Sequence, residues 1–161
     1  MKTLMTTAAL GVAMLALPAA AQVMTPTEYV TAAGASDLYE ITSSQLVLQT
    51  TQDLRVRDFA QMMVMHHTKS TADVKAAATR SRLRVAPPKL NPLQQELVTE
   101  LGGENGAARD AAYIAQQKAS HGQALNVQKA YAMEGTAPAL KAAATAIVPV
   151  VEQHIAALKT M

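Results

Sequence analysis

The sequence predicts an all-α protein, an antiparallel bundle of four long helices with a short extra helix between the second and third long ones. Three observations predict this fold. Only 3% of the 161 residues are aromatic, which disfavours a β-sandwich or barrel because strands draw on aromatic and β-branched residues. Strong helix formers such as alanine, leucine, methionine and glutamine dominate instead. Apolar residues also recur at the period of an amphipathic helix along most of the chain.

The composition excludes several classes of protein. The chain has no cysteine, which excludes a disulfide scaffold, a thiolate zinc site, an iron–sulfur cluster and a cysteine nucleophile. The formal net charge is +2 and the basic residues are scattered without a contiguous patch, so we expect no binding to nucleic acid. Motifs for serine hydrolysis or phosphate binding are absent, and hydrolase and nucleotide-binding functions therefore have no support.

The first 21 residues are typical of a cleaved secretory signal peptide. Met1-Lys2 provides a positive start, residues 4–17 are uncharged and mostly apolar, and Ala19-Ala20-Ala21 offers small residues to a signal peptidase. The apolar run is shorter than the ~20 residues of a membrane-spanning helix. We therefore predict export to the periplasm, cleavage after Ala21, a single domain over residues 22–161 and no integral membrane anchor in the mature protein.

The first long helix begins at a capping box. Thr25 and Glu28 supply the two side chains of the box, and Pro26 stands at the first helical position. This helix is predicted to run to about Thr51. Its predicted inward face carries Val30, Ala33, Ile41, Ser44 and Leu48.

The second long helix is capped by Asp53 and is predicted to reach about Leu83. Its inward residues follow the 3.6-residue period: Val56, Phe59, Ala60, Met63, His67, Val74, Ala77 and Ala78. A short helix then begins at Asn91-Pro92 and ends near Leu101.

The third long helix is predicted from about Ala107 to Glu134. Gly135 stands at the position of a left-handed C-cap, and Thr136 is predicted to cap the last helix. The inward face of that last helix carries Leu140, Ala144, Ile147, Val151, His154 and Leu158. Short turns after the first and third long helices indicate two antiparallel hairpins, which pack as a four-helix bundle.

Polar side chains interrupt the apolar faces of the long helices. Each helix carries one inward ligand candidate, in chain order Glu40, His67, His121 and His154. From the rise per residue, Glu40 and His67 lie about 18 and 21 Å from the turn that joins their helices. His121 and His154 lie about 21 and 27 Å from theirs. The four side chains are therefore predicted to converge near the middle of the bundle, whereas His66 points about 100° away from His67 and is predicted to be exposed.

This set predicts a site for a single divalent metal ion. Burying a lone carboxylate or imidazole is costly, and pairing or metal binding relieves the cost. Imidazole and carboxylate ligands suit zinc, iron or manganese. Copper is favoured less, because the methionines of residues 62–65 do not share one helix face and methionine commonly fills gaps in cores.

Two alternatives to a protein that only binds this metal ion are open. In the first, the inward polar residues form a hydrogen-bonded core in a non-catalytic structural or interaction protein of the cell envelope. The second and weaker alternative is an enzyme acting on peroxide or superoxide.

Several short motifs accompany these positions: Asp37-Leu38-Tyr39-Glu40, Phe59 to Val64, His66-His67-Thr68, Tyr113 with His121, and Pro149 with His154. Together they resemble the exported bacterial family known as domain of unknown function 4142. The resemblance covers about residues 26–159, nearly the whole mature chain. It implies a ferritin-like four-helix bundle that is usually exported and has no well-established activity.

The chain departs from that family and from ferritins in informative ways. His66 stands where the family has an aspartate, which removes a carboxylate partner for the site, and Arg109 replaces a phenylalanine. Ferritin di-iron sites use two Glu-x-x-His pairs, and this sequence contains none, so iron storage and ferroxidase chemistry are not implied. A second family of methionine- and histidine-rich exported helical proteins shares the Met-Met-x-x-His-His pattern but lacks the matching glutamate and later histidines.

Overall fold

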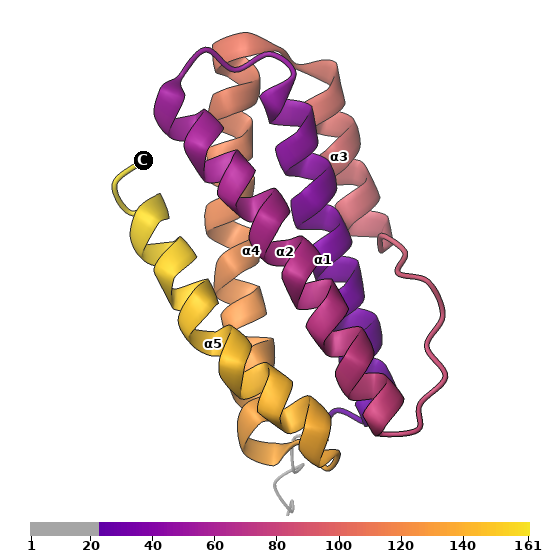
Figure 1. Ribbon diagram of the computed structural model, residues 1–161. Helices are drawn as coiled ribbons and strands as arrows, with labels where there is room; N and C mark the ends of the chain where they lie inside the picture. The colour runs from indigo at the N-terminus through magenta and orange to yellow at the C-terminus, as the bar shows by residue number, and fades with distance from the viewer. Residues whose placement is uncertain (1–22) are drawn as a thin grey trace, which may run out of the picture.

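The computed structural model describes residues 23–161, and this part of the chain consists of five α-helices without a strand (Figure 1). In chain order they are α1 (Pro26–Leu48), α2 (Leu54–Arg80), α3 (Pro92–Gly103), α4 (Gly106–Glu134) and α5 (Pro138–Leu158). The predicted all-α fold, with a short helix between the second and third long ones, is confirmed. Among the described helices, none has the length and apolar character needed to cross a membrane. The predicted signal peptide, residues 1–21, lies outside the described residues.

Local sequence signals set the starts of the first three helices. Thr25 and Glu28 make both hydrogen bonds of the capping box before α1, and Asn91 and Gln94 make the equivalent pair before α3. The side chain of Asp53 accepts two backbone N–H groups in the first turn of α2. These three starts agree with the predicted ones.

The junction between α4 and α5 differs from the prediction. Gly135 has a φ of −55°, so it is not a left-handed cap, and the residue before α5 is Ala137, not Thr136. Glycine is needed at position 135 for space, because a Cβ atom there would lie 2.5 Å from the carbonyl oxygen of Tyr131 and 2.7 Å from its ring. Pro138 then occupies the first turn of α5, where a missing N–H is tolerated.

The four long helices form an antiparallel bundle in which each packs against two others. α1 with α2 and α4 with α5 form hairpins, while α1 also lies against α4 and α2 against α5. α2 ends at one end of the bundle and α4 begins at the other, so the segment between them returns along the outside (Figure 1). Within this segment, α3 packs on α1 and α4. One long connection of this kind is typical of ferritin-like bundles.

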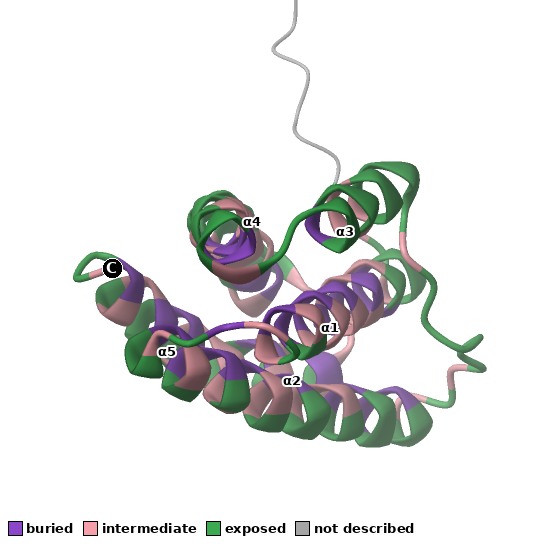
Figure 2. Cartoon of the chain, turned by 90° about the horizontal axis from the view of Figure 1, so that it is seen from above, coloured by how far each residue is buried: buried purple, intermediate pink, exposed green. Residues whose placement is uncertain are grey.

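The bundle interior changes character along its length. One apolar cluster, which includes Tyr29 and Leu140, lies at the α4–α5 turn, and another, which includes Phe59 and Leu158, lies toward the α1–α2 turn. Figure 2 shows the buried faces of the four long helices turned toward one another. Between the two clusters lies a set of buried polar residues, called here the polar layer: Asp37, Glu40, Ser43, Ser44, His67, Gln117, His121 and His154.

The predicted inward faces agree with the structure except in α1. Every residue predicted to face inward from α2 is buried, and in α5 only Ile147 is partly exposed. In α1, Ile41 and Leu48 are only half-buried, whereas Ser43 and Val47 are fully buried. The predicted positions of Val30, Ala33 and Ser44 are confirmed, since all three are buried. The prediction was wrong at Ile41 and Leu48 because the inward face of α1 is partly polar, and an assignment based on apolar residues misplaces that face around the helix.

Candidate metal centre

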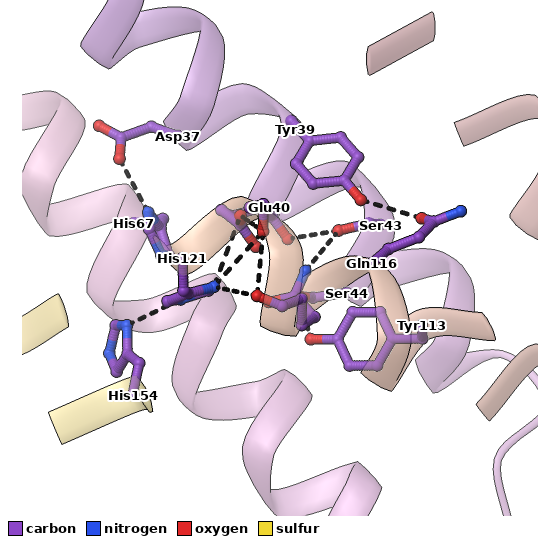
Figure 3. Close-up of polar contacts among 12 residues, drawn as sticks. Asp37, Tyr39, Glu40, Ser43, Ser44, His67, Tyr113, Gln116, His121 and His154 are labelled. Atoms are coloured by element: carbon purple, nitrogen blue, oxygen red, sulfur yellow. Dashed lines mark hydrogen bonds and ion pairs between the residues drawn. The ribbon is translucent and has the colours of Figure 1, made fainter. Parts of the chain in front are cut away.

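Three of the four predicted ligands meet in the polar layer (Figure 3). His67 of α2, His121 of α4 and His154 of α5 are 7%, 1% and 1% exposed. One ring nitrogen of each lies within 4.8 Å of the corresponding atoms of the other two. The bundle therefore gathers imidazole groups from three separate helices around one buried point.

The ring of His67 is oriented by Asp37 of α1. Nδ1 of His67 lies 2.8 Å from Oδ1 of Asp37, and the other carboxylate oxygen accepts a 3.1 Å hydrogen bond from Oγ1 of Thr71. When Nδ1–H donates to the carboxylate, the lone pair of Nε2 is left for the histidine cluster. This Nε2 is buried and has no hydrogen-bond partner within residues 23–161.

The ring of His121 is oriented by its own helix. Nδ1 of His121 lies 3.0 Å from the carbonyl oxygen of Gln117, one turn earlier in α4, and a carbonyl oxygen can only accept. Nδ1 therefore carries the proton, and Nε2 keeps its lone pair. Nε2 lies 3.2 Å from Nδ1 of His154, so the free nitrogen of His121 points into the cluster.

His66 provides the fourth imidazole of the region. Its Nδ1 lies 2.8 Å from Nε2 of His154, and the two rings are within 20° of parallel. The prediction that His66 is exposed was wrong: the side chain is half-buried, because α5 packs against the side of α2 that carries it. His154 therefore has one nitrogen toward His121 and the other toward His66.

Glu40, the fourth predicted ligand, lies beside the cluster and not within the group of three nitrogens. Its Oε1 accepts a 2.9 Å hydrogen bond from Oγ of Ser120 and lies 3.9 Å from Nδ1 of His121. Glu40 therefore approaches Nδ1 of the His121 ring, whereas Nε2 is the nitrogen that faces His154. Its Oε2 is buried with no hydrogen-bond partner among the described residues. The carboxylate thus contacts a candidate ligand from outside the cluster.

Sequence reasoning missed the roles of Asp37 and His66. Asp37 had a usable signal, since it lies three residues before Glu40 and therefore on the same face of α1. His66 gave no such signal. Its contact with His154 depends on which side of α2 packs against α5, and helix periodicity does not specify that side.

Burial and neighbouring charges shift the pKa values of the three histidines in different directions. Burial lowers the pKa of His121. Burial, together with the neighbouring histidines, lowers the pKa of His154 to about 3. Burial also acts to lower the pKa of His67, but the hydrogen bond to Asp37 and the charges of Glu40 and Asp37 outweigh it, so the net shift is upward. His121 and His154 are therefore neutral imidazoles with a lone pair to donate at neutral pH.

The polar layer holds two buried carboxylates next to these rings. Asp37 pairs with His67, and Glu40 lies near His121. In the part of the chain that the structure describes, neither carboxylate has a lysine or arginine within ion-pair distance. Two negative groups thus adjoin three imidazoles in a region otherwise enclosed by apolar clusters.

Comparisons with known proteins agree with this architecture. The family model described as "Domain of unknown function (DUF4142)" matches residues 13–161. A crystal structure from Streptomyces coelicolor, described as a secreted protein of the DUF305 type, superposes with a TM-score of 0.70 at 16% sequence identity. The match covers 85% of this chain and 90% of that chain, and at this identity it shows the fold alone. No curated protein matches the chain.

Proposed function

The chain belongs to the DUF4142 family, and from this premise we propose that it is an exported helical-bundle protein that binds a single divalent metal ion. The ligands are His67, His121 and His154. One observation carries the proposal: the buried Nε2 of His67 has no hydrogen-bond partner within residues 23–161, on a ring that has a nitrogen within 4.8 Å of a ring nitrogen of both His121 and His154. Buried polar atoms are almost always paired, so an unpaired one calls for a ligand or another specific explanation.

One pair of nitrogens in the group already has the spacing of two ligands on a tetrahedral ion. Zinc–nitrogen bonds of about 2.0–2.1 Å place two tetrahedral ligands about 3.3 Å apart. Nε2 of His121 and Nδ1 of His154 already lie 3.2 Å apart. Metal binding then requires His154 to carry its proton on Nε2, where Nδ1 of His66 accepts it. The other two rings already have the required tautomer.

The surrounding charges suit a divalent cation. Three neutral imidazoles bring no charge to the ion, and the carboxylates of Asp37 and Glu40 supply two negative charges nearby. Such partners fix ligand orientation and tune metal affinity. We assign Glu40 this balancing role, from its position beside His121, and leave the fourth coordination position to water or a substrate. An ion held in this way would act as a Lewis acid toward that fourth ligand.

The donor set favours zinc, followed by iron or manganese. Methionine sulfur would favour Cu(I), but Met63 is part of the apolar cluster near the α1–α2 turn and Met65 is 62% exposed. A metal-free polar core is the alternative function. It is favoured by the hydrogen bonds within the layer, such as Ser44 to Tyr113 at 2.8 Å and Gln117 to Ser43 at 3.3 Å. The unpaired atoms of Glu40 and His67 weigh against it.

Export is part of the same proposal. We propose that residues 1–21 are a cleaved signal peptide and that residues 22–161 form one periplasmic domain. The description of the structurally similar DUF305 protein as secreted supports this. Mass spectrometry of the protein recovered from cells tests it, and an intact N-terminus at Met1 would contradict it.

Metal analysis of protein purified without a histidine tag tests the metal site. We expect about one ion per chain, a rise in melting temperature on adding Zn²⁺ to the apoprotein, and loss of both in His67→Ala. His154→Ala serves as an independent variant, and helical circular dichroism checks that each variant folds. Less than ~0.1 ion per chain, with no change in His67→Ala, would leave the metal-free polar core as the better account.

A further inference from the structure

The three-histidine group has little contact with solvent, since His121 and His154 are each 1% exposed and His67 is 7% exposed. His67, His121 and His154 are all buried, so an ion must pass a more exposed side chain to reach them. His66 is the half-buried imidazole beside the group, and its Nδ1 lies 2.8 Å from Nε2 of His154. It lies where α2 packs against α5, on the more exposed side of the buried cluster.

His154 connects the two positions. Its Nδ1 lies 3.2 Å from Nε2 of His121, on the inner side, and its Nε2 faces His66, on the outer side. Both nitrogens of an imidazole can bind metal, although not with the same protonation. The rings of His66 and His154 are within 20° of parallel with centroids 5.1 Å apart, so their facing nitrogens point at each other along one line.

We propose that His66 and His154 form an outer cation position, through which a divalent metal ion reaches the inner three-histidine site. The ion binds Nε2 of His154, whose proton is on Nδ1, and binds Nδ1 of His66 after the proton of that nitrogen has moved through solvent to Nε2 of His66, so both rings stay neutral. Transfer of the ion to Nδ1 of His154 and the inner nitrogens then moves the proton of His154 from Nδ1 to Nε2, and no proton is released overall. This inference rests on the proposed function, because it requires the inner site to bind metal.

Two exposed ion pairs involve residues of the same helices. Lys69, one turn beyond His66, pairs with Asp73, and Glu152, two residues before His154, pairs with Lys129. The donors that face each other at this position are the imidazoles of His66 and His154.

Binding kinetics distinguish a role of His66 in metal uptake from a role in orienting His154. A residue on the uptake route changes the association and dissociation rates by the same factor and leaves Kd unchanged, because the equilibrium does not depend on the path. A residue that only orients His154 changes Kd, mainly through faster dissociation. The two roles of His66 therefore predict different results for the same variant.

The experiment uses the mature protein and Co²⁺, whose visible absorption reports binding, in stopped-flow measurements. His66→Asn retains an oxygen that accepts the N–H of His154 but loses the imidazole donor. We expect association and dissociation both to slow about tenfold with Kd unchanged. His66→Leu, which also removes the hydrogen bond, should slow association and weaken Kd as well. Gln61→Ala, an exposed change on the same helix, is the matched control and should have wild-type rates.

Unchanged rates in His66→Asn would overturn the inference and exclude His66 from the uptake route. A weaker Kd carried by dissociation alone would reduce His66 to an orienting partner of His154. Failure of the wild-type protein to bind Co²⁺ at all would instead contradict the proposed function, and the inference with it.

Discussion

Nδ1 of His67 lies 2.8 Å from Oδ1 of Asp37, and both side chains are buried at the contact between α2 and α1. The pair joins two helices through a single charged hydrogen bond. It also decides which nitrogen of His67 is free, since the carboxylate holds the proton on Nδ1. The residue that sets the tautomer is thus on a different helix from the candidate ligand.

Replacing this carboxylate should weaken metal binding without removing the site. In Asp37→Asn the side-chain oxygen still accepts from His67, but the negative charge is lost. We expect the Kd for Zn²⁺ to rise about 10- to 100-fold with unchanged stoichiometry. Competition with a chromogenic chelator measures this. Asp73→Asn, which alters an exposed carboxylate of α2, should leave the Kd as it is; equal Kd values in the two variants would contradict the role given to Asp37.

Glu40 can be tested as a charge partner against its predicted role as a ligand. In Glu40→Gln the hydrogen bond from Ser120 is retained and the charge is removed, so we expect about tenfold weaker Zn²⁺ binding at full stoichiometry. In His121→Ala a ligand is lost, and binding should become undetectable in the same chelator assay. If Glu40→Gln abolished binding as completely as His121→Ala, Glu40 would belong among the ligands after all.

Two glycines should respond to alanine in opposite directions. In Gly135→Ala the new Cβ would collide with the backbone carbonyl of Tyr131, and we expect a loss of about 1–3 kcal/mol in the free energy of unfolding. Within α4, nothing lies within 4 Å of a Cβ at position 122. Gly122→Ala should therefore gain about 0.5–1 kcal/mol. Urea denaturation of both variants measures the difference, and destabilisation by Gly122→Ala would contradict the packing described here.

Because several tyrosines are buried, we expect the protein to lose stability at high pH. Burial raises the pKa of Tyr29, Tyr39 and Tyr113 above the usual value. Above a pH of about 10 the unfolded chain loses these protons while the folded chain retains them, so the free energy of unfolding falls as the pH rises. Each tyrosine contributes a slope of about 1.4 kcal/mol per pH unit in that range.

Thermal denaturation between neutral pH and pH 11 tests this prediction. Tyr113→Phe removes one of the titrating groups, along with the hydrogen bond to Ser44, and should show a shallower alkaline decline from a lower starting stability. An identical slope in wild-type protein and variant would show that Tyr113 does not take part. Below about pH 10 these tyrosines should have no effect on the pH dependence, because both states are protonated.

Much of the fold was predictable because its signals are local or strictly periodic. The inward face of α2 is apolar at nearly every turn, and His67 alone interrupts it, so all of its buried residues follow from spacing. The face of α1 was predicted wrongly at Ile41 and Leu48, because its inward side contains carboxylate and hydroxyl groups. The prediction of a left-handed cap at Gly135 was wrong, since its φ is −55°. The glycine is required there because a Cβ atom would collide with Tyr131, a contact that only the folded turn creates.

The candidate site was predictable in part, because depth along a helix follows from counting residues. That count brought His67, His121 and His154 to within about one helical turn of one another, and in the structure one nitrogen of each lies within 4.8 Å of the others. Which nitrogen is free, and which neighbour holds the other, depends on contacts between helices. The contacts of Asp37 and His66 therefore required the structure.

The polar layer also fixes the axial alignment of the helices. Apolar contacts are not directional, so polar pairs discriminate most sharply against sliding one helix by a turn, about 5.4 Å. The same slide would separate His67 from Asp37 and Tyr113 from Ser44, and would bury unpaired polar groups against apolar ones at a cost of several kcal/mol. One set of side chains therefore both forms the candidate metal site and selects a single register for the bundle.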